Sequence, residues 1–242
     1  MRGMTGYVLR AAAGSVTGRR YSDNFDVVHL DEDPLLAVVA DGMGDGEGSR
    51  VAGRIAVDVF VDRLSRQAAD PARLRNAVAV AQARVGEAGA RIGLLTGCTL
   101  TALVASEAGL WLTQIGDSRG YRLRDGLLEQ LTVDHTMAWL GAINGWYPFD
   151  SPEAHAARYR LTRYVGHPAH PEPDVLNLAP RPGDVLLLCT DGVPDQVPYE
   201  RVREVLASPA SPAEQVRRLL ADTEQAGGRD NASAVVVHVV PA

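Results

Sequence analysis

Four aspartates that are far apart in the chain lie where apolar runs begin or end. Asp41 follows LLAVVA, Asp117 follows LWLTQIG, Asp191 follows DVLLLCT, and Asp230 precedes NASAVVVHV. Runs of this kind, bounded by Gly or Asn, are typical of buried strands. If the four strand ends meet, they form a dense cluster of negative charge that cannot stay away from water without cations. The pattern therefore favours a fold in which distant strands end close together.

Clustered carboxylate oxygens are the ligands that Mg²⁺ and Mn²⁺ prefer, and paired ions of this kind commonly hydrolyse phosphoesters. Each aspartate taken singly has another interpretation, because Asp-Gly after a strand is often only a turn. We accept the turn for Asp125, in a hairpin around Asp125–Gly126. For Asp41, Asp191 and Asp230 the turn interpretation stays open.

Composition limits the classes of protein to consider. The 242 residues and 46% hydrophobic content suffice for one substantial core, and no linker divides the chain, so residues 1–242 are expected to form a single domain. The formal charge of −6 and the scattered arginines argue against nucleic-acid binding. No stretch is apolar for long enough to cross a bilayer, and the N-terminus lacks the apolar run of a signal peptide. We therefore expect a cytoplasmic protein with no membrane partner.

Two residue types exclude further chemistry. All 24 basic residues are arginine, which removes any Walker-type phosphate lysine and any Schiff-base lysine. Cys98 and Cys189 both lie in predicted core strands. They are expected as buried thiols in a reducing compartment rather than as a disulfide or a metal pair.

The element order predicts an α+β fold. Helices are expected after Gly48, from Pro71 with Asp70 as its N-cap, and from Pro212 with Ser211 and Glu214 as a capping box. Strands, a helix pair, many antiparallel strands, a second helix pair and a last strand do not alternate as a parallel sheet requires. Two antiparallel sheets, packed together and covered by helices on both sides, fit this order better. The expected strands lie near 26–30, 35–40, 99–105, 110–115, 119–124, 127–131, 174–178, 184–189 and 233–240.

Six segments, in chain order, resemble the motifs of the metal-dependent protein phosphatases of the PP2C (PPM) type, in their compact bacterial form. They are VVADGMGDGEGS, GCTLTALV, IGDSRGYRLRDG, LTVDHT, PRPGDVLLLCTDGV and GGRDNASAVVVHV. Each short motif alone is weak, but six in family order with sensible spacing make a strong signal. The resemblance implies a four-layer α-β-β-α sandwich whose two central antiparallel sheets are flanked by helix pairs.

The resemblance also implies roles for the aspartates. Asp41 would bridge two Mg²⁺ or Mn²⁺ ions, and the Gly42 carbonyl would ligate one of them. Asp191 and Asp230 would complete the shell of the other ion, partly through waters. Asp117 corresponds to the family's ligand for a third, weaker ion, so two or three ions are expected.

Other matched positions would support this centre. Asp26 and Asn24 match the N-x-D of the family's first motif, where the Asp supports the metal shell, and Asn231 follows the last aspartate in the family's DN pair. Two cations that share a water lower its pKa and neutralise the phosphoryl oxygens. No covalent phospho-enzyme is needed, so neither cysteine is expected to be a nucleophile.

Three positions depart from the family pattern. The family's phosphate-binding Arg is replaced by Tyr21, with Arg19 and Arg20 just before it, so any of the three could meet the substrate phosphate. Met43 stands where animal members have a candidate general-acid His, which leaves the general acid unassigned. Asp45 makes the neighbouring loop more acidic, and solvation alone can account for it.

The segment at about 134–170 is rich in aromatic residues and corresponds to a variable flap in the family. Trp139 and Tyr164 are expected in a small core that staples this long loop. Trp146, Tyr147 and Phe149 are candidates for a lid that shapes a binding pocket.

The favoured function is hydrolysis of phosphoserine and phosphothreonine monoesters in proteins by a metal-activated water. Tyr21 and the aromatic lid motivate an alternative, the same chemistry on a small phosphorylated metabolite. A third hypothesis, a non-catalytic regulatory module, is weakened because all four aspartates are present. The chain is expected to act as a monomer.

Overall fold

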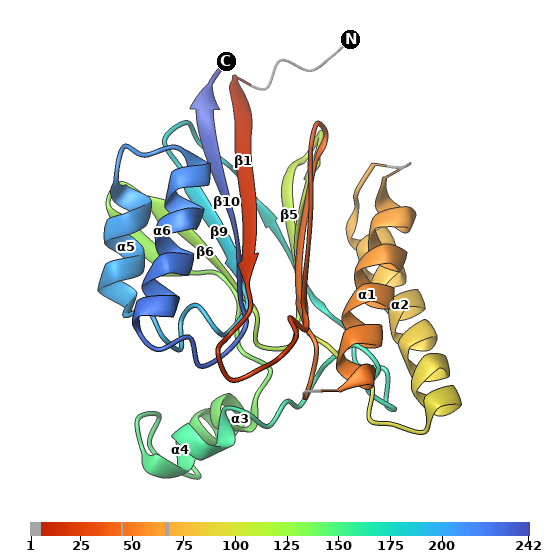
Figure 1. Ribbon diagram of the computed structural model, residues 1–242. Coiled ribbons are helices and arrows are strands. Elements are labelled where there is room, and N and C mark those ends of the chain that lie inside the picture. Colours follow the sequence, from red (N-terminus) through yellow and green to blue (C-terminus); the bar gives the residue numbers. More distant parts are fainter. Residues whose placement is uncertain (1–5, 45, 66–67) are drawn as a thin grey trace.

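Two five-stranded antiparallel sheets lie face to face in the computed structural model, which describes residues 6–44, 46–65 and 68–242 (Figure 1). Asp45 lies outside the described residues. The first sheet has the order β1 (Tyr7–Val16), β10 (Ala232–Pro241), β9 (Val185–Cys189), β6 (Arg119–Arg124) and β7 (Leu127–Gln130). The second has the order β2 (Asp26–Glu32), β3 (Leu35–Asp41), β4 (Leu100–Ser106), β5 (Gly109–Ile115) and β8 (Asp174–Leu178).

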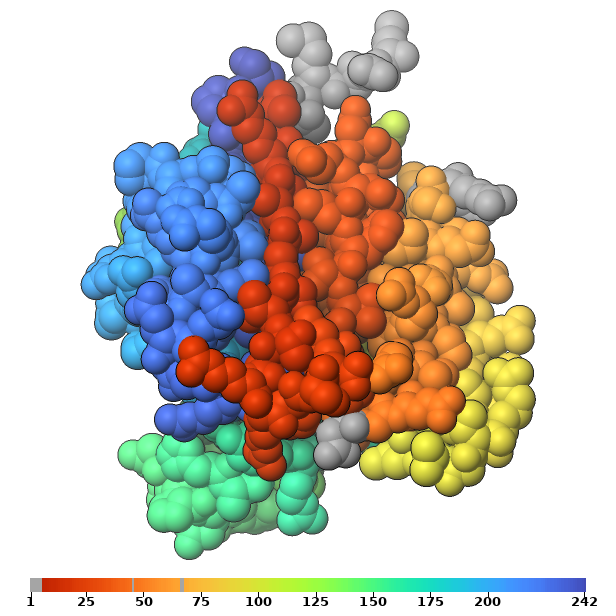
Figure 2. Space-filling view, in the orientation of Figure 1, coloured from red at the N-terminus to blue at the C-terminus, as the bar shows by residue number. Residues whose placement is uncertain are grey.

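Helices cover the outer face of each sheet, which confirms the predicted α-β-β-α sandwich (Figure 1). The second sheet is covered by α1 (Glu47–Leu64) and α2 (Pro71–Ile92), and the first by α5 (Tyr199–Ala207) and α6 (Pro212–Gln225). Two short helices, α3 (Met137–Ile143) and α4 (Pro152–Ala157), form a separate lobe at one end of the sandwich. Figure 2 shows this green lobe standing out from the rest of the surface.

The apolar runs of the sequence are continuous because the central strands are buried on both faces. In β3, Val38 and Ala40 pack with α1 and α2, whereas Ala37 and Val39 pack between the two sheets. The same alternation divides β10 between the inter-sheet core and the layer under α5 and α6. Because both faces are buried, these strands appear in the sequence as continuous apolar runs and can be predicted from them.

All nine predicted strands are present, and the first strand of the chain was missed. The sequence of β1, YVLRAAAGSV, is dominated by small residues and lacks the β-branched run of a buried strand. Its small residues let α6 approach: a Cβ added at Gly14 would lie 2.8 Å from Val216 Cγ1. The strand is therefore specified by packing under α6 and by its ten-residue ladder with β10.

Local signals predicted from the sequence are confirmed at several boundaries. Asp70 accepts a hydrogen bond from the Arg73 amide, and Ser211 accepts one from the Glu214 amide, so both cap their helices. The β6–β7 hairpin turns at Asp125–Gly126 with positive φ at both residues, 52° and 80°. In the part of the chain that the structure describes, no helix is both long and apolar enough to cross a membrane. Cys98 and Cys189 are buried and unpaired, as expected.

Candidate metal centre

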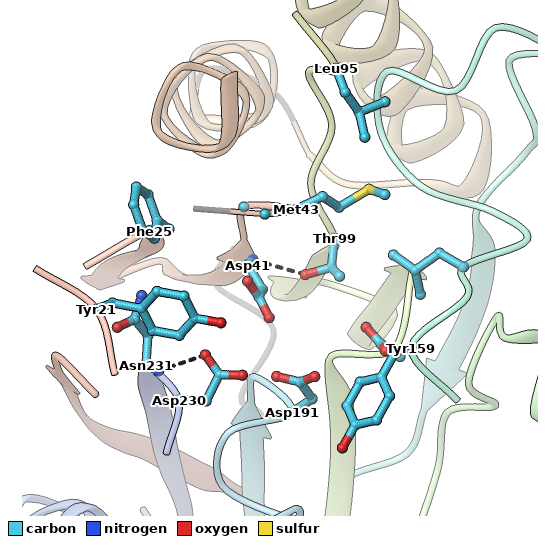
Figure 3. Close-up of a pocket in the computed structure, with 14 residues that line it drawn as sticks. Tyr21, Phe25, Asp41, Met43, Leu95, Thr99, Tyr159, Asp191, Asp230 and Asn231 are labelled. Atoms are coloured by element: carbon cyan, nitrogen blue, oxygen red, sulfur yellow. Dashed lines mark hydrogen bonds between the residues drawn. The ribbon is translucent and has the colours of Figure 1, made fainter. Parts of the chain in front are cut away.

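The four aspartates singled out in the sequence line one cavity of about 240 Å³ at the end of the sandwich. Asp41 ends β3 in the second sheet, and Asp191 and Asp230 lie at the ends of β9 and β10 in the first. Asp117 lies in the β5–β6 connection between the two sheets. Figure 3 shows the carboxyl groups of Asp41, Asp191 and Asp230 directed into the same space. The cavity is thus assembled from both sheets.

The GCTLT segment connects Asp41 to the turn that carries Asp117 through hydrogen bonds. The Thr99 hydroxyl accepts a hydrogen bond of 2.9 Å from the Asp41 amide, drawn in Figure 3, and lies 2.6 Å from the Ser118 hydroxyl. The Thr101 hydroxyl donates to the Ser118 carbonyl at 2.8 Å. Because these threonines are buried on β4 or just before it, they fix the spacing between two strand ends.

Asp26 lies behind the cavity wall and ties the two sheets together. It is in register with Asp41 on the neighbouring strand. Its Oδ2 accepts hydrogen bonds from the hydroxyls of Thr190, at 2.8 Å, directly after β9, and Ser233, at 2.7 Å, in β10 of the other sheet. Its Oδ1 is buried without a hydrogen-bond partner. Burial, together with neighbouring carboxylates, raises the pKa of Asp26 to about 7.

The cavity holds negative charge that the described residues compensate only in part, through Arg119 near Asp117 and Asp191 and Arg20 near Asp230. Burial first, and then the neighbouring aspartates, raise the pKa values of Asp41 and Asp117 well above their usual range. Burial, Asp195 and Asp230 raise the pKa of Asp191 to about 6. The Asp191 Oδ1 atom is buried without a partner. An unpaired buried carboxylate oxygen surrounded by like charges is the environment that a cation would stabilise.

The donor set fits hard divalent cations that keep part of their hydration. Within residues 6–44, 46–65 and 68–242, no three Asp, Glu, His or Cys side chains are placed to enclose an ion on their own. The carboxylates instead surround a cavity with room for water, and Mg²⁺ in particular retains several waters and uses few protein ligands. Carboxylate and water oxygens suit Mg²⁺ and Mn²⁺, so the residues present fit these ions.

The glycines after Asp41 and Asp191 both have a steric role beside the cavity. Neither Gly42 nor Gly192 has positive φ. A Cβ at Gly42 would lie 2.5 Å from the Ser49 carbonyl oxygen, and one at Gly192 would lie 1.9 Å from that of Asn231. The turn interpretation is therefore wrong for Asp41, which ends strand β3. Asp191 and Gly192 do form a turn, closed by a 3.2 Å hydrogen bond from the Val193 amide to the Thr190 carbonyl. At both positions Asp-Gly lets two backbones pack closely beside the cavity.

The three candidate phosphate-binding residues occupy different places. Tyr21 lines the cavity, and Figure 3 shows its ring beside Asn231 and above Asp230. Arg20 is exposed, with its guanidinium 5.9 Å from the Tyr21 ring centroid. Arg19 is also exposed, and its amide donates to the Gly228 carbonyl at 2.6 Å.

The two candidate support residues hold the first loop. The Asn24 side chain accepts from the Asp26 amide at 3.1 Å and donates to Ser15 at 2.7 Å. The Asn231 side chain accepts a hydrogen bond from the Gly18 amide at 3.0 Å, and the backbone amide of Asn231 donates one to the Asp230 carboxylate. Both residues therefore fix the chain on either side of Tyr21.

The lid candidates lie in the α3–α4 lobe but not on the cavity wall. The Tyr147 hydroxyl donates to the Met137 carbonyl and its ring packs on Gly141, so this residue belongs to the interior of the lobe. Trp146 and Phe149 are exposed. Trp139, expected in a small core, is 38% exposed and packs edge-on against Phe149.

Sequence reasoning missed the residues of this segment that do reach the cavity. Tyr159 and Leu161 line it, and Arg158 forms a 2.7 Å ion pair with Asp195 in the loop after β9. These residues follow α4 in an irregular stretch, where periodicity gives no signal. The ion pair joins the lobe to the sandwich.

Comparisons with known proteins place the chain in a family. The family described as "Protein phosphatase 2C" matches residues 13–226. Serine/threonine protein phosphatase PstP of Mycobacterium tuberculosis is 34% identical over 243 residues, which cover 96% of this chain and 45% of PstP. The chain thus spans about half the length of this relative.

Two solved structures are similar over nearly the whole chain. The catalytic domain of PstP in complex with two manganese ions is 33% identical, with a TM-score of 0.85, over 97% of this chain and 99% of that one. The PPM Ser-Thr phosphatase MsPP of Mycobacterium smegmatis in complex with cacodylate is 35% identical, with a TM-score of 0.84, over 96% and 98%.

We expect Mn²⁺ to stabilise the wild-type protein and Asp191→Asn to reduce that effect. Removing one buried charge relieves repulsion, so the metal-free variant should melt at or above the wild-type temperature while gaining less from Mn²⁺. For wild type at 100 times the dissociation constant, the gain is about 2.7 kcal/mol. Thermal melts with EDTA and with Mn²⁺ measure both effects, with Asp125→Asn as the matched control. Equal Mn²⁺-dependent gains in wild type and Asp191→Asn would contradict the assignment.

Proposed function

The chain belongs to the protein phosphatase 2C family, and from this premise we propose that it hydrolyses phosphoserine and phosphothreonine monoesters with the help of Mg²⁺ or Mn²⁺. One observation carries the proposal: Asp41, Asp191 and Asp230 meet in a single cavity whose negative charge nearby arginines offset only in part. Three separate strands converge there, and structural stability alone does not require mutually repelling carboxylates at that point.

The metal ligands follow from the position of each carboxylate. Asp41 with the Gly42 carbonyl, and Asp191 with Asp230, would hold two ions, and Asp117 would contribute to a third. When bound, the ions supply an activated water and neutralise the phosphoryl oxygens. Asp26 does not line the cavity, and we assign it to holding Asp41 from behind through the β2–β3 register.

Substrate phosphate must approach a strongly acidic surface, so a donor at the cavity wall is needed. Tyr21 offers its hydroxyl, and burial together with Asp230 raises the Tyr21 pKa, so the group stays protonated and can donate. Arg20 lies over the same ring and adds positive charge at longer range. We assign Tyr21 to phosphate binding and Arg20 to attraction of the phosphate; Arg19 is left to a structural role.

Proteins are the favoured substrates over small metabolites. The related proteins PstP and MsPP are both described as Ser/Thr phosphatases. The lobe beside the cavity carries exposed Trp146 and Phe149, a surface suited to a polypeptide around the phosphorylated residue. An enclosing pocket for a metabolite would turn these rings inward. The non-catalytic module is disfavoured because every candidate metal carboxylate is retained.

The remaining expectations are proposals of the same kind. The lobe within 134–170 acts as the lid of a single domain and selects among substrates. Two free buried cysteines agree with a cytoplasmic location. The protein acts as a monomer.

Purified protein with Mn²⁺ should hydrolyse p-nitrophenyl phosphate, and EDTA should abolish the reaction. Asp191→Asn and Asp230→Asn should each lower kcat by more than about 100-fold, because losing a direct ligand exceeds the loss of an outer partner. Asp125→Asn, the same change in a surface turn, is the matched control. Near wild-type rates in Asp191→Asn with an unchanged circular dichroism spectrum would refute the ligand assignment, and wild-type inertness with Mn²⁺ would refute the function.

Tyr21→Phe should raise KM for a phosphopeptide by about 10-fold, because a hydrogen bond to a charged group contributes roughly 1.5–3 kcal/mol. Arg20→Gln should have a smaller effect that fades as salt is added, since an exposed charge is screened. Arg19→Gln is the control and should leave KM unchanged. Steady-state kinetics at two salt concentrations separate these cases; a larger effect from Arg19→Gln than from Tyr21→Phe would reverse the assignment.

Phe149→Ala, or a shortened 144–153 loop, should lower kcat/KM for phosphopeptides by about 5-fold, as expected for an interface contact of about 1 kcal/mol. Turnover of p-nitrophenyl phosphate should stay the same because Phe149 does not line the cavity that this small substrate occupies. Leu127→Ala removes an exposed apolar side chain on β7 and is the matched control. Equal losses on both substrates would show that the lobe does not select substrates.

A further inference from the structure

His135, from the LTVDHT segment, holds the turn that carries Asp117. The ring of His135 is buried, and its Nδ1 accepts a 3.1 Å hydrogen bond from the Gly116 amide. The His135 amide in turn donates to the Gly116 carbonyl at 2.9 Å. His135 therefore bonds both polar groups of Gly116, whose carbonyl also accepts from the Gln114 side chain, and Gly116 immediately precedes Asp117.

Two partners of His135, the Gly116 amide and the Asp174 carboxylate, indicate which ring nitrogen carries the proton. A backbone amide can only donate, so Nδ1 must be unprotonated and Nε2 carries the hydrogen in the neutral ring. Nε2 lies 3.1 Å from Asp174 Oδ2, where it can donate. Asp174 is held by the Arg163 guanidinium at 2.8 Å, and that guanidinium also contacts Nε2. Burial lowers the pKa of His135, in keeping with a neutral ring.

The Asp117 turn needs such support. Gly116 has a φ of 108°, and a Cβ there would lie 2.6 Å from Thr99, so the turn is tightly confined on that side. On the other side of Asp117, Ser118 is held by Thr99 and Thr101. Asp117 carries a carboxylate that Asp191 repels. Without fixed neighbours, the turn could move to relieve this repulsion.

We propose that His135 is a positioning residue that, held by Asp174 and Arg163, fixes Gly116 so that Asp117 presents its carboxylate to a divalent cation in the cavity. The inference rests on the proposed function, because it takes Asp117 as a cation ligand. Asp174 lies on edge strand β8, outside the cavity. It would influence metal affinity through two hydrogen bonds, one between Asp174 and His135 and one between His135 and Gly116. His135 itself touches neither metal nor substrate.

Side-chain replacements separate this role from mere filling of space. In His135→Asn the side-chain oxygen can take the place of Nδ1 and accept from the Gly116 amide. The longer side chain of His135→Gln reaches towards Asp174 instead, and His135→Leu offers no acceptor. Isothermal titration calorimetry with Mn²⁺ should show the weakest site about 10- to 100-fold weaker in His135→Gln and His135→Leu. His135→Asn should stay within about threefold of wild type, since the Gly116 hydrogen bond is kept. His238→Leu, a half-buried histidine bound to Gln215 far from the cavity, is the control and should not change Mn²⁺ affinity.

If the His135 variants do not fold, a second pair decides the matter. Asp174→Asn keeps an acceptor for Nε2–H and should bind Mn²⁺ as wild type does, whereas Asp174→Leu should bind it more weakly. Wild-type Mn²⁺ affinity in His135→Gln and His135→Leu, equal weakening in Asn and Leu variants, or a protonated Nδ1 in the ¹⁵N spectrum would overturn the proposal. Because calorimetry needs no turnover, a catalytically inert wild type would refute the proposed function and still leave this inference testable.

Discussion

Mutual repulsion among buried carboxylates is the constraint around which this end of the molecule is built. Asp41, Asp117, Asp191 and Asp230 face one cavity, and each has its pKa raised by burial and by its neighbours. Charges that repel one another would move apart if their backbones allowed it. The surrounding hydrogen bonds, through Thr99 and Asn231 among others, therefore act chiefly on main-chain groups next to the aspartates.

Close backbone packing adds a second restraint at the same place. A Cβ at Gly18 would lie 2.3 Å from the Asp230 carbonyl carbon, and Gly42 and Gly192 are equally confined. Each glycine allows one loop to rest directly on the backbone of another. The strand ends are thus held by contact between main chains, which relax less readily than side chains. This rigidity suits a site whose ligands must stay in place before any cation arrives.

The sequence allowed the sandwich and the cavity to be predicted, because both depend on local patterns. Apolar runs, capping residues and strand-end aspartates each carry their signal within a few positions. The missed features depend on distant partners: β1 is specified by α6, and the Asp26 oxygen is bound by Thr190 and Ser233, 164 and 207 positions away. In the lobe, aromatic composition suggested Tyr147 for the cavity, whereas the fold turned it inward and brought Tyr159 there instead.

Because each sheet supplies part of the cavity, cation binding and inter-sheet packing are expected to depend on each other. Asp41 ends β3 in one sheet, whereas Asp191 and Asp230 lie at the ends of β9 and β10 in the other, so any ion shared between Asp41 and Asp191 would link the two sheets. Asp26 already makes such a link, through hydroxyls in and directly after strands of the opposite sheet. A ligand that binds only the assembled arrangement stabilises that arrangement. The apolar inter-sheet core then brings the carboxylates together against their repulsion, and the ions would remove the repulsion that the core has had to overcome.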